Sequence, residues 1–154
     1  MRMNVRIARA SAFAIALILP LLVMALGPAA RAADGVDGVW LTQAGDAKVA
    51  VSRCGSGLCG KVVWLRDPID PATNKAQVDD KNENPKLRTR PIIGIALFLG
   101  MKGTGPNAWA GQIYNADDGK TYASTVKLTD SGQLEVRGCA GPLCGTENWS
   151  RSSR

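Results

Sequence analysis

Residues 109–137 read W-A-G-Q-I-Y-N-A-D-D-G-K-T-Y-A-S-T-V-K-L-T-D-S-G-Q-L-E-V-R, and this stretch decides the fold. Two turn signals interrupt it, Asp118-Gly119 and Asp130-Ser131-Gly132, in which glycine supplies a positive φ. Between the turns, alternate residues share one face of a strand: Tyr122, Ser124, Val126 and Leu128. After the second turn, Leu134 and Val136 continue the alternation. The pattern predicts antiparallel strands joined in sequence by tight turns.

The same signals extend over the rest of the chain and predict about eight short strands. Their ranges are 38–42, 47–53, 60–65, 92–101, 109–114, 120–128, 133–137 and 145–151. We therefore expect an all-β fold, a small antiparallel up-and-down β-barrel, because closing the sheet removes its edges. The residues expected to point inward include Val49, Val51, Val63, Ile113, Tyr122 and Leu134. A barrel of this size is either filled by its side chains or holds one small ligand.

The first 32 residues have the pattern of a cleavable secretory signal helix. Arg2, Arg6 and Arg9 precede an uncharged apolar run, and Ala30-Arg31-Ala32 fits the small-x-small rule of signal peptidase. The alternative is an uncleaved membrane anchor. The run is shorter than the roughly 20 residues of a spanning helix, and Pro20 interrupts it, which favours cleavage. We predict a signal peptide over 1–32, cleavage after Ala32, a single domain over 33–154, and a periplasmic or secreted protein without a stable membrane anchor.

Composition narrows the functions that are open to this chain. Its 154 residues include no His, so imidazole-dependent triads, dyads and metal ligands are excluded. Removal of 1–32 takes away four of the 19 basic residues and no acid, leaving 15 basic against 13 acidic residues. A near-neutral chain without a basic stripe does not predict nucleic-acid binding. Residues 80–84 resemble the start of a calcium loop, but Pro85 and Pro91 occupy its glycine and glutamate positions. We expect no metal, no cofactor and no catalytic residue.

Four cysteines form two pairs of matching context. Residues 54–64 and 139–149 both read C-x3-L-C-G-x3-W, with a glycine-containing loop inside each pair. An even set of cysteines in an exported chain predicts disulfides. Crossed bridges would close loops of about ninety residues and stabilise the fold by roughly 4–5 kcal/mol. Local bridges would stabilise it by roughly 2 kcal/mol. We favour local bridges, Cys54 with Cys59 and Cys139 with Cys144, because each spacing reads as a turn between facing strand ends.

Residues 66–91 form a long segment rich in Pro, Asn, Asp and Lys, where a short turn would be usual. Such a segment is either a lid or binding loop, or a solvent-exposed loop without a binding role. Arg88 and Arg90 lie at its end, where they would hold a ligand carboxylate or phosphate, or pair with Asp79, Asp80 or Glu83. The candidate ligand-binding residues are Asn84, Arg88, Arg90, Tyr114 and Tyr122. Asn84 before Pro85 also favours a capping role.

The assembled motifs resemble a known family. They are G-V-W at 38–40, C-G-x-x-L-C-G-K-V-V-W-L at 54–65, N-P at 84–85, R-x-R-P-I-I-G at 88–94, G-Q-I-Y-N-x-x-D-G-K-T-Y at 111–122 and L-x-V-R-G-C-x-G-x-L-C-G-x-x-x-W-x-R at 134–151. This series is similar to the bacterial exported family known as domain of unknown function 2147. The resemblance implies a lipocalin-like barrel and carries no established activity.

A second resemblance is to the wider class of lipocalin-like, or calycin, barrels. These begin with G-x-W on the first strand and place an Arg from the end of the barrel across that Trp. Here Gly38 and Trp40 match the first element, and Arg151 is the candidate for the second. A guanidinium stacked on an indole would cover the barrel base. The resemblance therefore implies contact between Trp40 and Arg151. The tryptophans Trp64, Trp109 and Trp149, like Trp40, are expected in the core or at barrel ends, the alternative being a ligand cage.

Three functional hypotheses follow. The preferred one is an exported barrel that binds a small apolar or amphipathic molecule or an envelope component. The second is an interaction or structural module with a filled barrel. The third is an enzyme using loop carboxylates. A continuous cavity that opens near residues 66–91 would favour the first hypothesis, and a solid core would favour the second.

Overall fold

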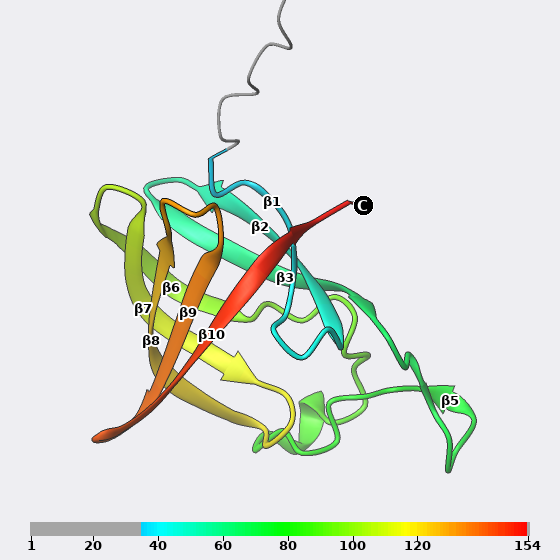
Figure 1. Cartoon of the computed structure of the whole chain (residues 1–154). Coiled ribbons are helices and arrows are strands. Elements are labelled where there is room, and N and C mark those ends of the chain that lie inside the picture. The colour runs from blue at the N-terminus through cyan, green and yellow to red at the C-terminus, as the bar shows by residue number, and fades with distance from the viewer. Residues whose placement is uncertain (1–34, 154) are drawn as a thin grey trace, which may run out of the picture. The chain divides into compact units, whose positions relative to one another are not determined.

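The chain folds into a closed, antiparallel β-barrel of eight strands, which confirms the predicted fold class (Figure 1). The computed structural model describes residues 35–153, and the predicted signal helix and its cleavage site lie outside them. The strands are β1 (Gly38–Leu41), β2 (Ala47–Cys54), β3 (Gly57–Leu65), β6 (Phe98–Gly105), β7 (Ala108–Asn115), β8 (Lys120–Leu128), β9 (Leu134–Ala140) and β10 (Leu143–Ser152). They pair in the order β1-β10-β9-β8-β7-β6-β3-β2. Within residues 35–153, no helix is long and apolar enough to cross a membrane.

One predicted strand is shorter than expected. The apolar run 92–101 suggested a single strand, but β6 begins only at Phe98. The residues before it form a turn, in which Gly94 has a φ of 107° and Ile95 donates to the Ile92 carbonyl. This turn still continues the barrel wall beside β3, because the Val62 N–H donates to Ile95 O and the Gly94 N–H donates to Val62 O. A continuous apolar run does not distinguish a strand from a buried turn.

Both disulfides are local, as predicted. Cys139 and Cys144 lie opposite each other in the β9–β10 register, with their Cα atoms 4.1 Å apart. The Cys54–Cys59 bridge is diagonal instead, because Cys59 lies opposite Ser52 in the β2–β3 register, and its Cα atoms are 5.8 Å apart. Each bridge therefore constrains one hairpin. The two disulfides indicate an oxidising compartment.

A bulge in β3 reverses the side-chain alternation at its end. Val49 pairs with Val62 and Lys48 pairs with Trp64, so Val63 is an extra residue on its strand. Val63 and Trp64 are each 39% exposed, and Lys48 Nζ lies 5.4 Å from the Trp64 ring. Val63 was expected to point inward, but it follows the buried and inward Val62 and so faces outward by ordinary alternation. The bulge then turns Trp64 outward as well, so of the two places expected for Trp64, the core or a barrel end, the core was wrong.

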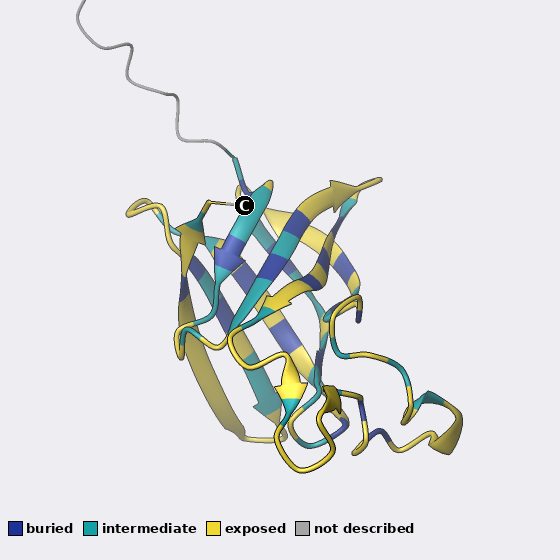
Figure 2. Cartoon of the chain, turned by 90° about the vertical axis from the view of Figure 1, so that its right-hand side faces the viewer, coloured by how far each residue is buried: buried dark blue, intermediate teal, exposed yellow. Residues whose placement is uncertain are grey.

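The barrel interior is packed solidly at one end, which we call the closed end. This is the end of the β2–β3, β6–β7 and β8–β9 turns. The buried cluster there includes Trp40, Val49, Val51, Leu58, Met101, Trp109, Val126 and Leu134. Phe98 and Trp149 stack across the interior with ring centroids 5.8 Å apart. Dark bands of buried residues alternate with exposed ones along the strands (Figure 2), as a barrel with one inner face requires.

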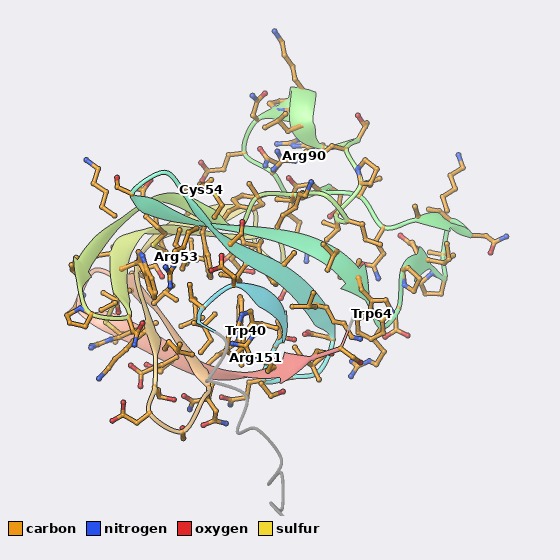
Figure 3. All side chains as sticks on the ribbon, turned by 90° about the horizontal axis from the view of Figure 1, so that it is seen from above. Trp40, Arg53, Cys54, Trp64, Arg90 and Arg151 are labelled. Carbon is orange, nitrogen blue, oxygen red and sulfur yellow. A yellow bond between two sulfur atoms is a disulfide. The ribbon has the colours of Figure 1, made fainter. Side chains whose placement is uncertain are left out.

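The barrel closes at a short seam, the pairing of residues 39–41 of β1 with residues 150–152 of β10. Trp40 and Arg151 are opposite each other in this register, and the guanidinium carbon lies 4.4 Å from the Trp40 ring (Figure 3). Arg151 also donates to Gly35 O at 2.7 Å and to Asp37 O at 3.0 Å. A Cβ on Gly38 would lie 2.5 Å from Arg151 Nη1, which explains the glycine in G-x-W. The implied contact between Trp40 and Arg151 is present.

We expect Arg151→Ala to lower the free energy of unfolding by about 1–2 kcal/mol, because it removes a cation–π contact and hydrogen bonds to backbone carbonyls. The free energy of unfolding of Arg151→Lys should lie between those of wild type and Arg151→Ala. An ammonium keeps the charge but loses the planar fork of hydrogen-bond donors. Urea unfolding followed by tryptophan fluorescence measures both. Equal stability of wild type and Arg151→Ala would contradict the role of the seam.

Candidate functional site

The interior is hollow at the other end, which we call the open end. A cavity of about 830 Å³ lies there, bordered by the β1–β2 turn, the β7–β8 turn and the β9–β10 hairpin. Apolar side chains in its lining include Val62, Leu65, Leu97, Ile113, Val136 and Trp149. This volume is in the range of cavities that hold small ligands. The barrel is thus filled at one end and open at the other.

Glycines on the inward face make the cavity wide. Gly138 of β9 and Gly145 of β10 lie opposite each other and both line the cavity. A Cβ built on Gly145 would have no atom within 4 Å, so the space beside this strand is unfilled. Large residues fill the closed end at the corresponding inward positions of the same strands, with Leu134 on β9 and Trp149 on β10. The hollow therefore follows from the distribution of small and large residues along the strands.

Polar side chains surround the mouth of the cavity. They are Asp46, Arg66, Asp67, Gln77, Asp117 and Glu147. Arg66 Nε lies 3.3 Å from an Asp67 carboxylate oxygen, and its Nη1 donates to Ala44 O at 3.4 Å. Three of these residues belong to the segment 66–91, so this long segment borders the mouth.

The segment 66–91 is folded, and not the structureless loop that its composition suggested. It contains a two-stranded hairpin, β4 (Ile69–Asp70) and β5 (Lys75–Ala76), and a 3-10 turn, η1 (Pro85–Leu87). Its two halves are bridged where Val78 pairs with Pro91. Asn84 caps η1, because its side chain accepts from the Lys86 backbone N–H. The predicted capping role of Asn84 is observed.

A buried carboxylate attaches this segment to the barrel. Asp79 is fully buried, and its Oδ1 accepts from the Tyr114 hydroxyl at 2.5 Å. Its Oδ2 accepts from Asn82 Nδ2 at 2.8 Å and forms an ion pair with Arg90 Nη2 at 2.8 Å. Each interaction compensates part of the cost of burying the charge. We call this set the Asp79 cluster: Asp79, Asn82, Arg90 and Tyr114.

Tyr114 remains a hydrogen-bond donor in this cluster. Burial raises the pKa of its hydroxyl above the ordinary value, and the hydrogen bond to Asp79 raises this pKa further. The neutral phenol is therefore favoured over a wide pH range, and the part of the stability that depends on it is lost only as pH rises through that raised pKa.

The predicted ligand-binding residues divide into two groups. Tyr114 and Tyr122 line the cavity. Arg90 pairs with Asp79, as the alternative interpretation held, and Arg88 Nε donates to Asn82 O at 2.7 Å. These two arginines, with Asn84, order the segment 66–91 and are not among the cavity-lining residues.

Tyr122 bonds to a carboxylate at the β7–β8 turn. Its hydroxyl donates to Asp118, and this hydrogen bond is the main reason that the pKa of Asp118 is lowered. The same bond raises the pKa of the Tyr122 hydroxyl. The contact holds the Tyr122 ring against the cavity wall next to the turn.

Sequence reasoning missed Glu147. It lines the cavity, and Trp149 Nε1 donates to its Oε2 at 2.7 Å. Residues two apart on a strand share a face, so the inward position of Trp149 would have placed Glu147 on the same face of β10, farther toward the open end. Among residues 35–153, no three metal-binding side chains come together.

An eight-stranded antiparallel barrel with one closed end and a ligand-sized cavity at the other defines a lipocalin-like protein. A family model described as "Uncharacterized protein conserved in bacteria (DUF2147)" matches residues 38–151, and the chain belongs to this family. A solved structure described as "Protein HP1028 from the human pathogen Helicobacter pylori belongs to the lipocalin family" is similar, with a TM-score of 0.64 and 27% sequence identity. The similarity covers 76% of this chain and 82% of that one. No curated protein matches the sequence.

We expect Tyr114→Phe to lower the free energy of unfolding by about 1–2 kcal/mol, because it leaves the buried Asp79 carboxylate without one donor. The segment 66–91 should also be cleaved faster in limited proteolysis at Lys81 and Lys86. Tyr122→Phe is the matched control, since its hydroxyl bonds to a less buried carboxylate. Equal losses in the two variants would contradict the special role of the Asp79 cluster.

Tyr122→Phe should raise the pKa of Asp118 toward its ordinary value, because the hydrogen bond that stabilises the carboxylate is removed. In wild type, the stability contributed by this bond is present above the unfolded pKa of an aspartate, about 4, and is lost as pH falls through the folded pKa. Carboxyl-carbon NMR titration of both proteins measures the shift. An unchanged Asp118 titration would show that the bond is absent in solution.

Proposed function

We propose that this protein is an exported carrier that binds a small apolar or amphipathic molecule inside its barrel. The observation that carries the proposal is the cavity of about 830 Å³ at the open end, with apolar walls and a polar mouth. Apolar walls with a few polar groups are characteristic of small-molecule sites. The segment 66–91 borders the mouth, where it would limit access to the interior.

The alternative of a filled barrel is less well supported. The packed cluster reaches from the closed end to Phe98 and Trp149, and the space beside Gly145 is unfilled. An enzyme based on loop carboxylates has less support too, because Asp79 is engaged by Tyr114, Asn82 and Arg90. The similar Helicobacter pylori protein is described as a member of the lipocalin family, which is in keeping with a binding role here.

We also propose that the protein is exported and cleaved after Ala32. The signal-like sequence of residues 1–32 and the two disulfides support this proposal. N-terminal sequencing of protein isolated from the periplasm or the medium should begin at Ala33. A first residue of Met1 in that material would contradict cleavage.

Filling the cavity should weaken binding. We expect Gly145→Phe to weaken binding of the neutral dye N-phenyl-1-naphthylamine at least about ten-fold, since a phenyl ring would take up space that the dye needs. Its fluorescence rises on transfer from water to an apolar site, which gives the measurement. Extraction and mass spectrometry of wild-type protein purified from its own periplasm should show a copurifying amphiphile that the variant lacks.

Gly105→Phe is the matched control, because Gly105 also has open space at its Cβ and lies outside the cavity lining. It should bind the dye like wild type. Equal dye affinity in wild type and Gly145→Phe, or no binding by wild type, would overturn the proposal.

A further inference from the structure

Glu147 places an exposed carboxylate at the mouth of the cavity. It precedes Trp149 by two residues on β10, so the two side chains share the inward face. The hydrogen bond from Trp149 Nε1 to Glu147 Oε2, 2.7 Å long, fixes the carboxylate against an indole that is itself part of the core cluster. The position is therefore set by packing as well as by the strand.

The Glu147 carboxylate has no cationic partner within residues 35–153. The ion pairs there join Arg53 to Asp37, Arg66 to Asp67 and Arg90 to Asp79. The hydrogen bond from Trp149 Nε1 occupies Oε2, and the residue is exposed to solvent at the mouth. A cationic group of a ligand would supply the missing counter-charge.

The rest of the mouth has the same sign of charge. The lining residues include the carboxylates of Asp46, Asp67 and Asp117, against the guanidinium of Arg66. Arg66 is already held by Asp67 and by Ala44 O. A mouth of this charge attracts cations and repels carboxylates and phosphates.

Two of the three aromatic residues that line the cavity contribute to the site. Trp149 adjoins Glu147, and Tyr122 lines the same cavity from β8. Aromatic faces bind alkylammonium groups through the ring quadrupole, and a nearby carboxylate adds to this attraction. The apolar side chains Val62, Leu97 and Ile113 would contact the hydrocarbon part of such a molecule.

From this geometry we infer that the ligand is a cationic amphiphile, whose ammonium group lies at Glu147 and whose apolar body fills the open end. The inference rests on the proposed function and specifies its ligand class. The apolar walls determine that an amphiphile binds, and Glu147 determines the sign of its head group.

The test uses three probes with the same ten-carbon chain: decyltrimethylammonium, decanol and decanoate. At pH 7.4, isothermal titration calorimetry of the full-length mature protein should show the ammonium binding at least about ten-fold more tightly than decanoate, with decanol between them. This comparison in wild type needs no variant. Equal affinities, or tighter binding of decanoate, would overturn the inference while leaving the carrier function in place. No binding of any probe would contradict both.

The variant Glu147→Gln tests whether Glu147 is the source of the preference for a cationic head group. It should weaken ammonium binding about ten-fold, strengthen decanoate binding, and leave decanol within about two-fold. Glu135→Gln is the matched control, because Glu135 is on the neighbouring strand β9, opposite Asn148, and lies outside the cavity lining. Equal losses in both variants would assign the preference to overall charge, which would overturn the role of Glu147.

Discussion

The short pairing between β1 and β10 is the interaction on which the barrel depends. A sheet becomes a barrel only when its first and last strands meet, and here β1 offers four residues for that contact. Three register pairs join the two strands, and the Trp40–Arg151 stack lies at the middle pair. The guanidinium also binds the carbonyls of the segment before β1, so one side chain connects the C-terminal strand, the first strand and the N-terminal residues of the described chain.

The interior of this closed barrel is divided into a filled end and a hollow end. Trp40, Leu58, Trp109 and Leu134 fill the closed end, and the Phe98–Trp149 stack adjoins the hollow above it. Beyond the stack, Gly138 and Gly145 take the inward positions, and the cavity begins. The segment 66–91 is held at the mouth by the buried Asp79 cluster, which makes this segment a fixed part of the site.

The sequence was sufficient for the features that depend on local pattern. Alternation and turn residues predicted the barrel, the spacing of the cysteines favoured both disulfides, and the G-x-W resemblance implied the Trp40–Arg151 contact. The bulge at Val63 was not predictable, because a single extra residue leaves no mark in an apolar run. The Asp79–Tyr114 hydrogen bond joins residues that are 35 apart, so only the folded chain brings them together. Glu147 could have been found, since its parity with Trp149 was visible in the sequence.

The half-filled interior also has a consequence for substitution. The solid core is concentrated at the closed end, and the cavity is at the open end. Substitutions at the exposed positions of the lining, Gly145 and Glu147, therefore remove little of the buried apolar area that keeps the chain folded. Exchange of Glu147, Tyr122 or Gly145 would therefore reshape the cavity while the Trp40–Arg151 contact at the closed end keeps the barrel closed.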